Sequence, residues 1–356
     1  MILGLLLAIG CGVSWGLCYA PMRILKQWEW ENIYAFFAFF GLFLGPLVVA
    51  FATVPHYIIV NQTAGAGLVA FMLFIGAISG ASGFLYSMTI PVIGLGLATA
   101  LNGGSSMAMS LLPLFVLHRK TILHPGGLFT LLGVGLSVIG ISLCGKGGAL
   151  REKESPTPET EQRKQSRGLN FWKSVLACCI AGALSSGMNV VLAFPNPIFD
   201  IARKFGSNDF GAANAFVTPY LVGGFVTNIV YAGRLLYARQ TFSRYLIPGA
   251  GLIRLALWSL LMGALFVFGA YSYAGAIGLL GSLGAVITWG VSMATMILTS
   301  SIWDMSLGEW RGEPLRIMAI GIFVLMIAIV ALSFAEYFHE LESGSYLLPG
   351  VSISCA

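Results

Sequence analysis

Long apolar runs dominate this sequence, and their length decides which solvent the chain can fold in. A window of about 19 residues locates runs that are long enough to cross the hydrocarbon core of a bilayer. Lipid offers no hydrogen-bond partner to a free backbone amide, so each run is expected to form an α-helix. The sequence therefore predicts an all-α membrane protein with ten transmembrane helices. The ten runs are 2–22, 32–53, 66–88, 92–117, 126–145, 171–193, 212–236, 249–271, 275–300 and 314–335.

The composition excludes a water-soluble domain. Hydrophobic residues make up 57% of the 356 residues, charged residues make up 9%, and the mean hydropathy is +0.87. Soluble domains carry about 25% charged residues, so this chain cannot cover itself against water. The six cysteines show no CxxC spacing, and the sequence contains no HExxH, GxSxG or Walker pattern. We therefore predict no metal, no cofactor and no enzymatic activity.

One polar segment divides the runs into two sets of five. Residues 146–170 carry mixed charges and a Ser-Pro-Thr-Pro stretch, which is typical of a flexible linker. Halves with an odd number of spans enter the membrane in opposite directions, as in transporters built from inverted repeats. The expected organisation is a first five-helix repeat, a linker, a second repeat and a C-terminal tail, at 1–145, 146–170, 171–340 and 341–356.

The distribution of Lys and Arg predicts the orientation. Of these 19 residues, 15 lie in or beside the odd-numbered connections between runs, and Arg119, Lys120, Arg203 and Lys204 lie in the even-numbered ones. Cytoplasmic loops carry an excess of Lys and Arg. We therefore expect the odd-numbered connections in the cytoplasm and both termini outside.

The polar residues within the runs are neutral. None of the fourteen carboxylates lies clearly within a run, although a charge at the bilayer centre, costing about 3 kcal/mol or more, marks a proton or ion path. A site built from hydroxyls, amides and aromatic rings suits a neutral polyol better than an ion. The candidate substrate-binding residues are Ser14, Tyr19, Tyr86, Asn102, Ser185, Asn189, Thr218, Tyr220, Tyr273, Trp289 and Ser292.

Each of these candidates also has a structural interpretation. A buried Asn can bond between helices, and Ser or Thr can bond back to its own helix. Tyr and Trp near the end of a span often serve as anchors at the membrane surface. These alternatives remain open from the sequence alone.

Several motifs resemble the bacterial L-rhamnose–proton symporter family, within the drug/metabolite transporter superfamily. The resemblance covers about residues 10 to 330, and its most specific part is the first loop. The matching residues are Cys18-Tyr19-Ala20-Pro21 with Arg23 and Lys26, Trp28-x-Trp30-Glu31, Gly182-x-x-Ser185-Ser186-Gly187-Met188, Pro219-Tyr220, Gly223-Gly224-x-x-x-Asn228, Tyr273-Ala274, Trp289 and Leu307-Gly308-Glu309-Trp310.

The resemblance implies a ten-helix carrier of the bacterial inner membrane that imports a 6-deoxyhexose with a proton. The residue patterns described above are consistent with this architecture and with a neutral substrate. They include no obvious proton-binding group inside a span. Asp200, Asp209 and Glu309 are weak candidates for proton coupling from a cavity mouth.

Two other functions stay open at this stage. An exporter of amino acids or other metabolites would have a similar shape, although no Lys or Arg lies deep inside a span to meet a substrate carboxylate. A membrane-embedded enzyme or a scaffold is the alternative of another class.

Overall fold

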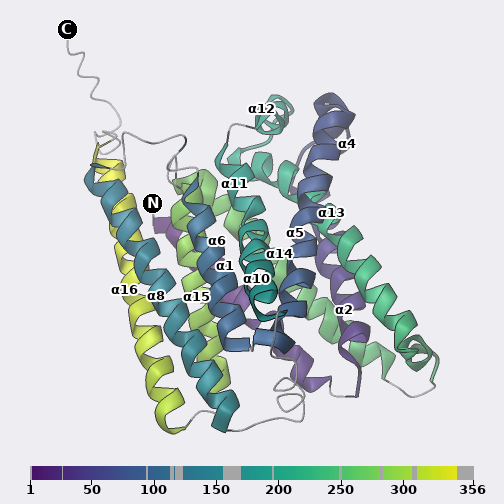
Figure 1. Cartoon of the computed structure of the whole chain (residues 1–356). Coiled ribbons are helices and arrows are strands. Elements are labelled where there is room, and N and C mark those ends of the chain that lie inside the picture. The colour runs from purple at the N-terminus through teal and green to yellow at the C-terminus, as the bar shows by residue number, and fades with distance from the viewer. Residues whose placement is uncertain are drawn as a thin grey trace.

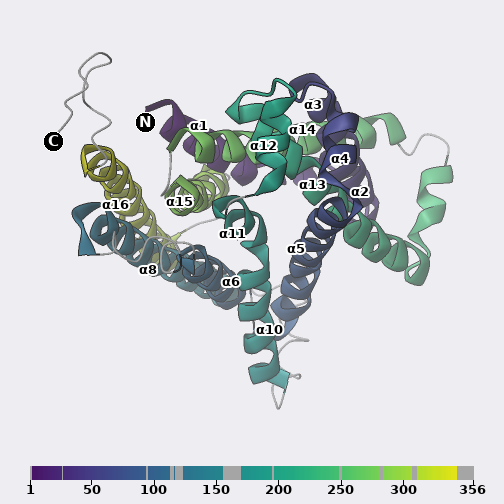
Figure 2. The same cartoon turned by 90° about the horizontal axis from the view of Figure 1, so that it is seen from above.

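The structure is a computed structural model with side chains, and Figures 1 and 2 show two views of it. It describes residues 2–25, 27–93, 95–112, 116, 123–154, 170–194, 196–247, 251–280, 284–306 and 311–342.

Within these ranges the chain is a helical bundle. The first half contains α1 (Ile2–Leu17), η1 (Ala20–Ile24), α2 (Trp30–Ala38), the π-helix η2 (Phe39–Leu44), α3 (Gly45–Thr53), α4 (Tyr57–Ala64), α5 (Ala66–Ile93), α6 (Leu95–Ser110) and α8 (Pro125–Glu154). The second half contains α10 (Asn170–Ser185), α11 (Gly187–Ala193), α12 (Pro197–Lys204), α13 (Asp209–Ala238), η4 (Thr241–Leu246), α14 (Leu252–Leu280), α15 (Gly284–Ser306) and α16 (Gly312–Glu342).

Nine helical stretches in the described residues are long and apolar enough to cross a membrane. They are Ile2–Met22, Trp30–Thr53, Ala66–Tyr86, Pro125–Arg151, Phe171–Ala193, Asp209–Ala238, Leu252–Leu280, Gly284–Trp303 and Gly312–Ala335. They confirm an all-α membrane protein and correspond to nine of the ten expected spans.

The remaining expected span, 92–117, is described only in part. Its helix α6 has 16 residues, which at 1.5 Å per residue is about 24 Å, short of the roughly 30 Å of hydrocarbon. Residues 113–115 and 117 lie outside the described residues. A tenth complete span therefore stays a prediction.

Two expected boundaries differ from the structure. The sequence suggests that one span ends at 271 and the next begins at 275, but α14 continues to Leu280. The polar and glycine residues at this point, including Ser272 and Gly275, are buried inside the bundle, so they do not end the helix. Similarly, α8 continues past 145 to Glu154. In this extension, Gly147 packs closely against the backbone of Pro314 in α16. The first part of the expected linker is therefore helical.

The second span changes its helix type in the middle. Its π-helical turn, η2, ends immediately before Gly45-Pro46. Proline has no backbone N–H, and π-helical turns frequently mark functional sites. The carbonyl of Pro46 itself accepts a hydrogen bond from the Tyr271 hydroxyl at 3.0 Å, and the Thr218 hydroxyl lies 3.5 Å away.

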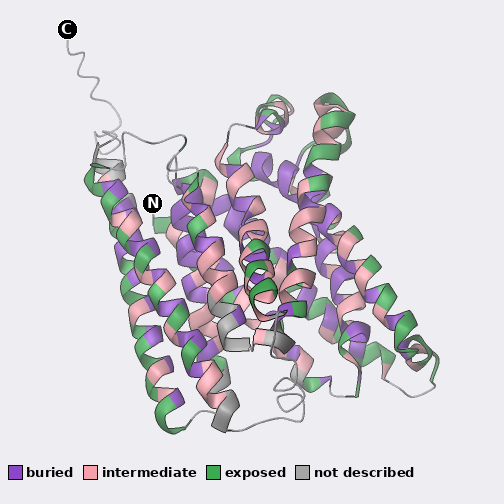
Figure 3. Cartoon of the chain, in the orientation of Figure 1, coloured by how far each residue is buried: buried purple, intermediate pink, exposed green. Residues whose placement is uncertain are grey.

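The helices surround a buried centre. α8 and α16 lie side by side at one edge of the bundle, and α2 and α13 lie toward the opposite edge (Figures 1 and 2). α4 and α12 lie at the same end of the bundle as Ile2 and the end of α16 (Figure 1). Exposed residues recur along the outer helices, whereas buried residues concentrate inside (Figure 3). The exposed residues include large apolar ones such as Phe74 and Phe323, as a lipid-facing surface requires.

Close helix crossings depend on glycine. A Cβ atom at Gly76 of α5 would overlap the backbone carbonyl of Tyr220 in α13, and one at Gly223 would overlap that of Leu73. Small residues let helices approach closely in lipid, where dispersion contacts drive association. These crossings hold α5 and α13 side by side, and both helices line the central cavity that is described in the next subsection.

Candidate functional site

A central cavity of about 300 Å³ lies between the two halves of the chain. It is lined by parts of α1, α2, α5, α10, α11, α13, α14 and α15. Its size is at the lower end of the range for small-molecule sites. Seven aromatic side chains contribute to the lining, namely Trp15, Tyr19, Tyr34, Phe37, Tyr220, Phe266 and Trp289.

The polar groups of the cavity are hydroxyls and one amide. Tyr34 donates a hydrogen bond of 2.6 Å to Oδ1 of Asn228, whose Nδ2 donates to the carbonyl of Gly224. The Trp289 indole N–H donates to the Ser106 hydroxyl at 3.2 Å. Among the described lining residues there is no carboxylate, Lys, Arg or His. The cavity is therefore electrically neutral and mostly apolar, with a few hydroxyl and amide groups in its wall.

One end of the cavity reaches the surface. Tyr19, near the end of α1, lines the cavity and is 45% exposed. Gly83 of α5 also lines the cavity and is exposed. Both lie toward the end of the bundle that carries η1 and η4. The expected orientation makes this end cytoplasmic.

A thin barrier closes the other end. A second pocket of about 160 Å³ lies beyond it and is lined by residues that include Arg203 and Asp209. Met188 of α11 faces the central cavity, and Leu192, one turn later, faces the second pocket. In α14, Ala270 likewise lines the central cavity and Ala274, one turn later, lines the second pocket. The two cavities are thus separated by about one helical turn, or about 5 Å.

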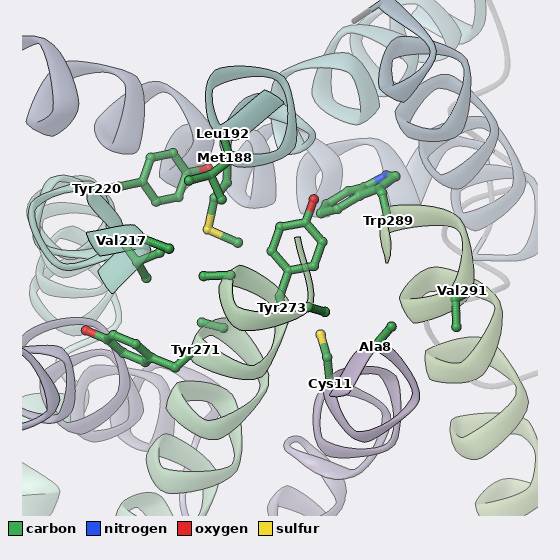
Figure 4. Close-up of a cluster of buried hydrophobic side chains, with 14 of the residues drawn as sticks. Ala8, Cys11, Met188, Leu192, Val217, Tyr220, Tyr271, Tyr273, Trp289 and Val291 are labelled. Carbon is green, nitrogen blue, oxygen red and sulfur yellow. The ribbon is translucent and has the colours of Figure 1, made fainter. Parts of the chain in front are cut away.

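Tyr273 and Asn189 form the core of this barrier. The Tyr273 hydroxyl donates a 2.5 Å hydrogen bond to Oδ1 of Asn189, and both side chains are fully buried. The Tyr273 ring lies beside that of Trp289 (Figure 4), with 5.6 Å between the ring centroids. The centroid of the Trp15 ring is 5.9 Å from that of Tyr273. Nδ2 of Asn189 has no hydrogen-bond partner among the described residues. A buried donor without a partner lowers the stability of this closed contact.

Four of the sequence-predicted residues line the central cavity. They are Tyr19, Ser185, Tyr220 and Trp289, from α1 or its end, α10, α13 and α15. Asn189 and Tyr273 lie behind the lining, in the barrier. The structure thus brings six of the predicted residues to one region.

The other predicted residues lie elsewhere. The Thr218 hydroxyl bonds the Asn214 carbonyl at 3.1 Å and the Tyr271 hydroxyl at 2.7 Å, and the Ser292 hydroxyl donates to the Ala8 carbonyl at 3.0 Å. These bonds hold helices together. Ser14 is buried, while Tyr86 and Asn102 are half-buried, and none of the three is part of the cavity lining.

Sequence reasoning missed Tyr34, Asn228 and Trp15 as cavity residues. Tyr34 lies one turn after Trp30, so the first-loop motif was a signal of its position. Asn228 stands out as a buried amide in an apolar run, but its partner is on a helix almost 200 residues away. Trp15 has no such signal, because its ring contacts come from α14 and α15.

One carboxylate, Glu31, lies at the start of a span, although the expected span began one residue after it. The second helix begins at Trp30 rather than at 32, and Glu31 is fully buried in its first turn. The proton-coupling candidates Asp200 and Asp209 are exposed, and both bond Arg203, at 3.2 Å and 3.0 Å. Glu309 lies outside the described residues.

The apolar bundle and its neutral, one-sided cavity are those of a multi-pass membrane transporter. Comparison with known proteins makes the assignment specific. Residues 1–336 match the family described as L-rhamnose-proton symport protein (RhaT), and the chain belongs to this family.

Curated relatives carry the same name. The chain is similar to the L-rhamnose-proton symporter of Mannheimia succiniciproducens, with 23% identity over 330 residues that cover 89% of this chain and 94% of the relative. It is also similar to the L-rhamnose-proton symporter of Yersinia pestis strain Pestoides F, with 24% identity over 349 residues that cover 94% and 98%. The protein is a transporter, and neither the exporter nor the enzyme alternative gains support from these relatives.

Proposed function

We propose that the protein imports L-rhamnose or a related 6-deoxyhexose together with a proton. Membership of the family supports a sugar symporter. The observation that carries the substrate class is the central cavity, which combines seven aromatic rings with hydroxyl and amide groups and has no charged side chain among its described lining residues.

The chemistry of a 6-deoxyhexose suits this lining. Such a sugar has hydroxyls on part of its surface and a methyl group with apolar C–H faces on the rest. Trp289 and Trp15 offer flat apolar faces, while Tyr34, Asn228 and Ser185 offer polar atoms. Asn189 follows Met188 at the inner wall, and its buried Nδ2 would reach a sugar hydroxyl only after the contact with Tyr273 opens. Apolar walls with a few polar groups are the usual composition of a small-molecule site.

The thin barrier supports transport by alternating access. The central cavity reaches the surface beside Tyr19, and the second pocket lies one turn away on the other side. Opening the contact between Asn189 and Tyr273, and closing the bundle around Tyr19, would expose the sugar to the opposite side. Rocking of two halves around a fixed central site is the usual mechanism in inverted-repeat transporters.

The way in which the first helix of each half packs against the other half supports the proposal of two repeats, 1–145 and 171–340. The first helix of the first half, α1, packs against α14 and α15 of the second half. The first helix of the second half, α10, packs against α5 and α6 of the first half in the corresponding way. The close crossing of Gly76 and Gly223 likewise has a counterpart in that of Gly41 and Gly263. We place this transporter in the bacterial inner membrane with both termini outside.

The substrate class can be tested by isothermal titration calorimetry on the purified protein. L-rhamnose is expected to bind more tightly than L-mannose, which differs by one hydroxyl at C6. That hydroxyl would be buried against aromatic rings without a partner, at a cost of about 1–3 kcal/mol, or at least about fivefold in Kd. A charged amino acid such as L-lysine is the control and should not bind. Binding of the amino acid without binding of either sugar would contradict the proposal.

A further inference from the structure

Glu31 is a buried carboxylate that the sugar cavity does not use. Its side chain is fully buried in the first turn of α2. Oε1 accepts a hydrogen bond from the Thr241 hydroxyl at 3.0 Å, and Oε2 accepts one from Nη1 of Arg239 at 3.1 Å. Among the carboxylates whose side chains the structure describes, it is the one that is buried. A buried charge in a span is expensive and marks a proton or ion path by default.

The ion pair is asymmetric in its contact with water. Arg239 is 58% exposed, whereas Glu31 is fully buried. If Glu31 takes a proton, a neutral carboxylic acid remains in the interior and the released guanidinium turns to water. Breaking a buried pair is costly when it leaves a buried charge alone. Protonation of Glu31 avoids that cost, because the charge left over is the exposed one.

The same helical turn connects Glu31 to the cavity. Tyr34 lies three residues later and donates its 2.6 Å hydrogen bond to Asn228 of α13, and both residues line the cavity. Nδ2 of Asn32 donates to the Thr241 carbonyl at 3.1 Å, so the turn is also held to η4. A change in the bonding of Glu31 is thereby transmitted by one rigid turn to two side chains that face the sugar.

The neighbouring charged groups are few. Besides Arg239, the described titratable side chains around this turn include Tyr34 of the turn itself, Tyr245 of η4, and the pair of Glu29 and Arg244, which are 2.8 Å apart. The Tyr245 hydroxyl donates to the Asn32 carbonyl at 3.0 Å, and burial raises the pKa of this phenol, so it stays neutral. Glu29 is half-exposed, and Arg244 also bonds the Gln27 carbonyl. Glu31 is thus the buried carboxylate of this group.

We propose that Glu31 is the proton-binding residue of the symport cycle, an inference that rests on the proposed function. In the state described here, the ionised carboxylate holds α2 to the end of α13. Binding of one proton forms one O–H bond on the carboxylate and breaks the ion pair with Arg239. The first turn of α2 can then shift with Tyr34, and release of that proton on the other side restores the ion pair.

Replacement of Glu31 by Gln separates sugar movement from proton coupling. In proteoliposomes with an inward gradient of about 1 pH unit, a one-proton symporter concentrates its sugar up to about tenfold, because 1.4 kcal/mol is a factor of ten. Glu31→Gln should lose this accumulation and reach only equal concentrations. Counterflow of labelled L-rhamnose, which needs no net proton transfer, should stay within about threefold of wild type and become independent of pH. The matched control is Glu29→Gln, which removes the half-exposed carboxylate two residues away and should accumulate sugar normally.

A second variant tests the role of Glu31 if the Glu31→Gln protein is not recovered from membranes. Arg239→Gln keeps the carboxylate but removes its countercharge, so the proton is retained to higher pH. The fall of counterflow with rising pH should move by about one pH unit in the alkaline direction. Full sugar accumulation by Glu31→Gln, or an Arg239→Gln pH profile identical to that of wild type, would overturn the role of Glu31. Absence of gradient-driven accumulation in the wild type would instead overturn the proposed function, and the role of Glu31 with it.

Discussion

Replacement of Trp289 by alanine will weaken L-rhamnose binding by about 30-fold while the protein still inserts and folds. The indole is 4% exposed, lines the central cavity, and packs edge-on against Tyr273 and Trp15. Its removal takes away an apolar face and the N–H that holds Ser106 at 3.2 Å. A loss of about 2 kcal/mol is typical for removing such a contact, and this corresponds to about 30-fold in Kd.

Titration calorimetry and a thermal melt on the same sample separate binding from stability. Trp172→Ala is the matched control, because Trp172 of α10 is 75% exposed on the outside of the bundle. It should leave the Kd unchanged. An unaltered Kd for Trp289→Ala would show that the sugar does not contact this ring and would remove Trp289 from the site.

Replacement of Gly76 by alanine is the substitution that we expect to destabilise the protein most. The added Cβ would overlap the backbone carbonyl of Tyr220, and a backbone atom cannot move aside as a side chain does. α5 and α13 would have to separate along a wall of the cavity. Overpacking costs about 1–3 kcal/mol and occasionally more, and we expect the upper part of that range.

Gly67 of the same helix supplies the control. A Cβ atom at Gly67 would meet no atom within 4 Å, so Gly67→Ala should change stability by less than about 1 kcal/mol. The measurement is the yield of monodisperse protein after gel filtration, together with its melting temperature in detergent. Equal yields and melting temperatures for the two variants would contradict the close packing of α5 on α13.

The sequence was sufficient for the membrane class and for most spans because hydrocarbon imposes simple length and polarity rules. Those rules fail where polar residues are buried by protein instead of lipid. The region around Tyr271 and Gly275 resembles a connection by composition, yet it lies inside α14, because neighbouring helices satisfy its polar groups. The predicted boundary between the eighth and ninth spans was therefore placed too early in the sequence.

The cavity was only partly predictable for a related reason. Tyr19, Ser185, Tyr220 and Trp289 could be chosen as polar or aromatic residues within spans. Their chemistry alone did not distinguish them from Ser292, whose hydroxyl is used by the carbonyl of Ala8.

The burial of Glu31 was hidden by distance along the chain. It lies one residue before the expected start of its span, and the groups that bury and pair it, Arg239 and Thr241, are more than 200 residues later. Such pairings depend on how α2 meets α13, which hydropathy does not report.

The most direct test of a proton-coupled sugar transporter is uptake of labelled L-rhamnose into proteoliposomes with and without an inward proton gradient. We predict that the gradient drives accumulation above the external concentration, and that a proton ionophore reduces it to equilibrium. Vesicles without protein give the background. Sugar entry that stops at equal concentrations in both conditions, or no entry at all, would rule out proton-coupled transport of this sugar.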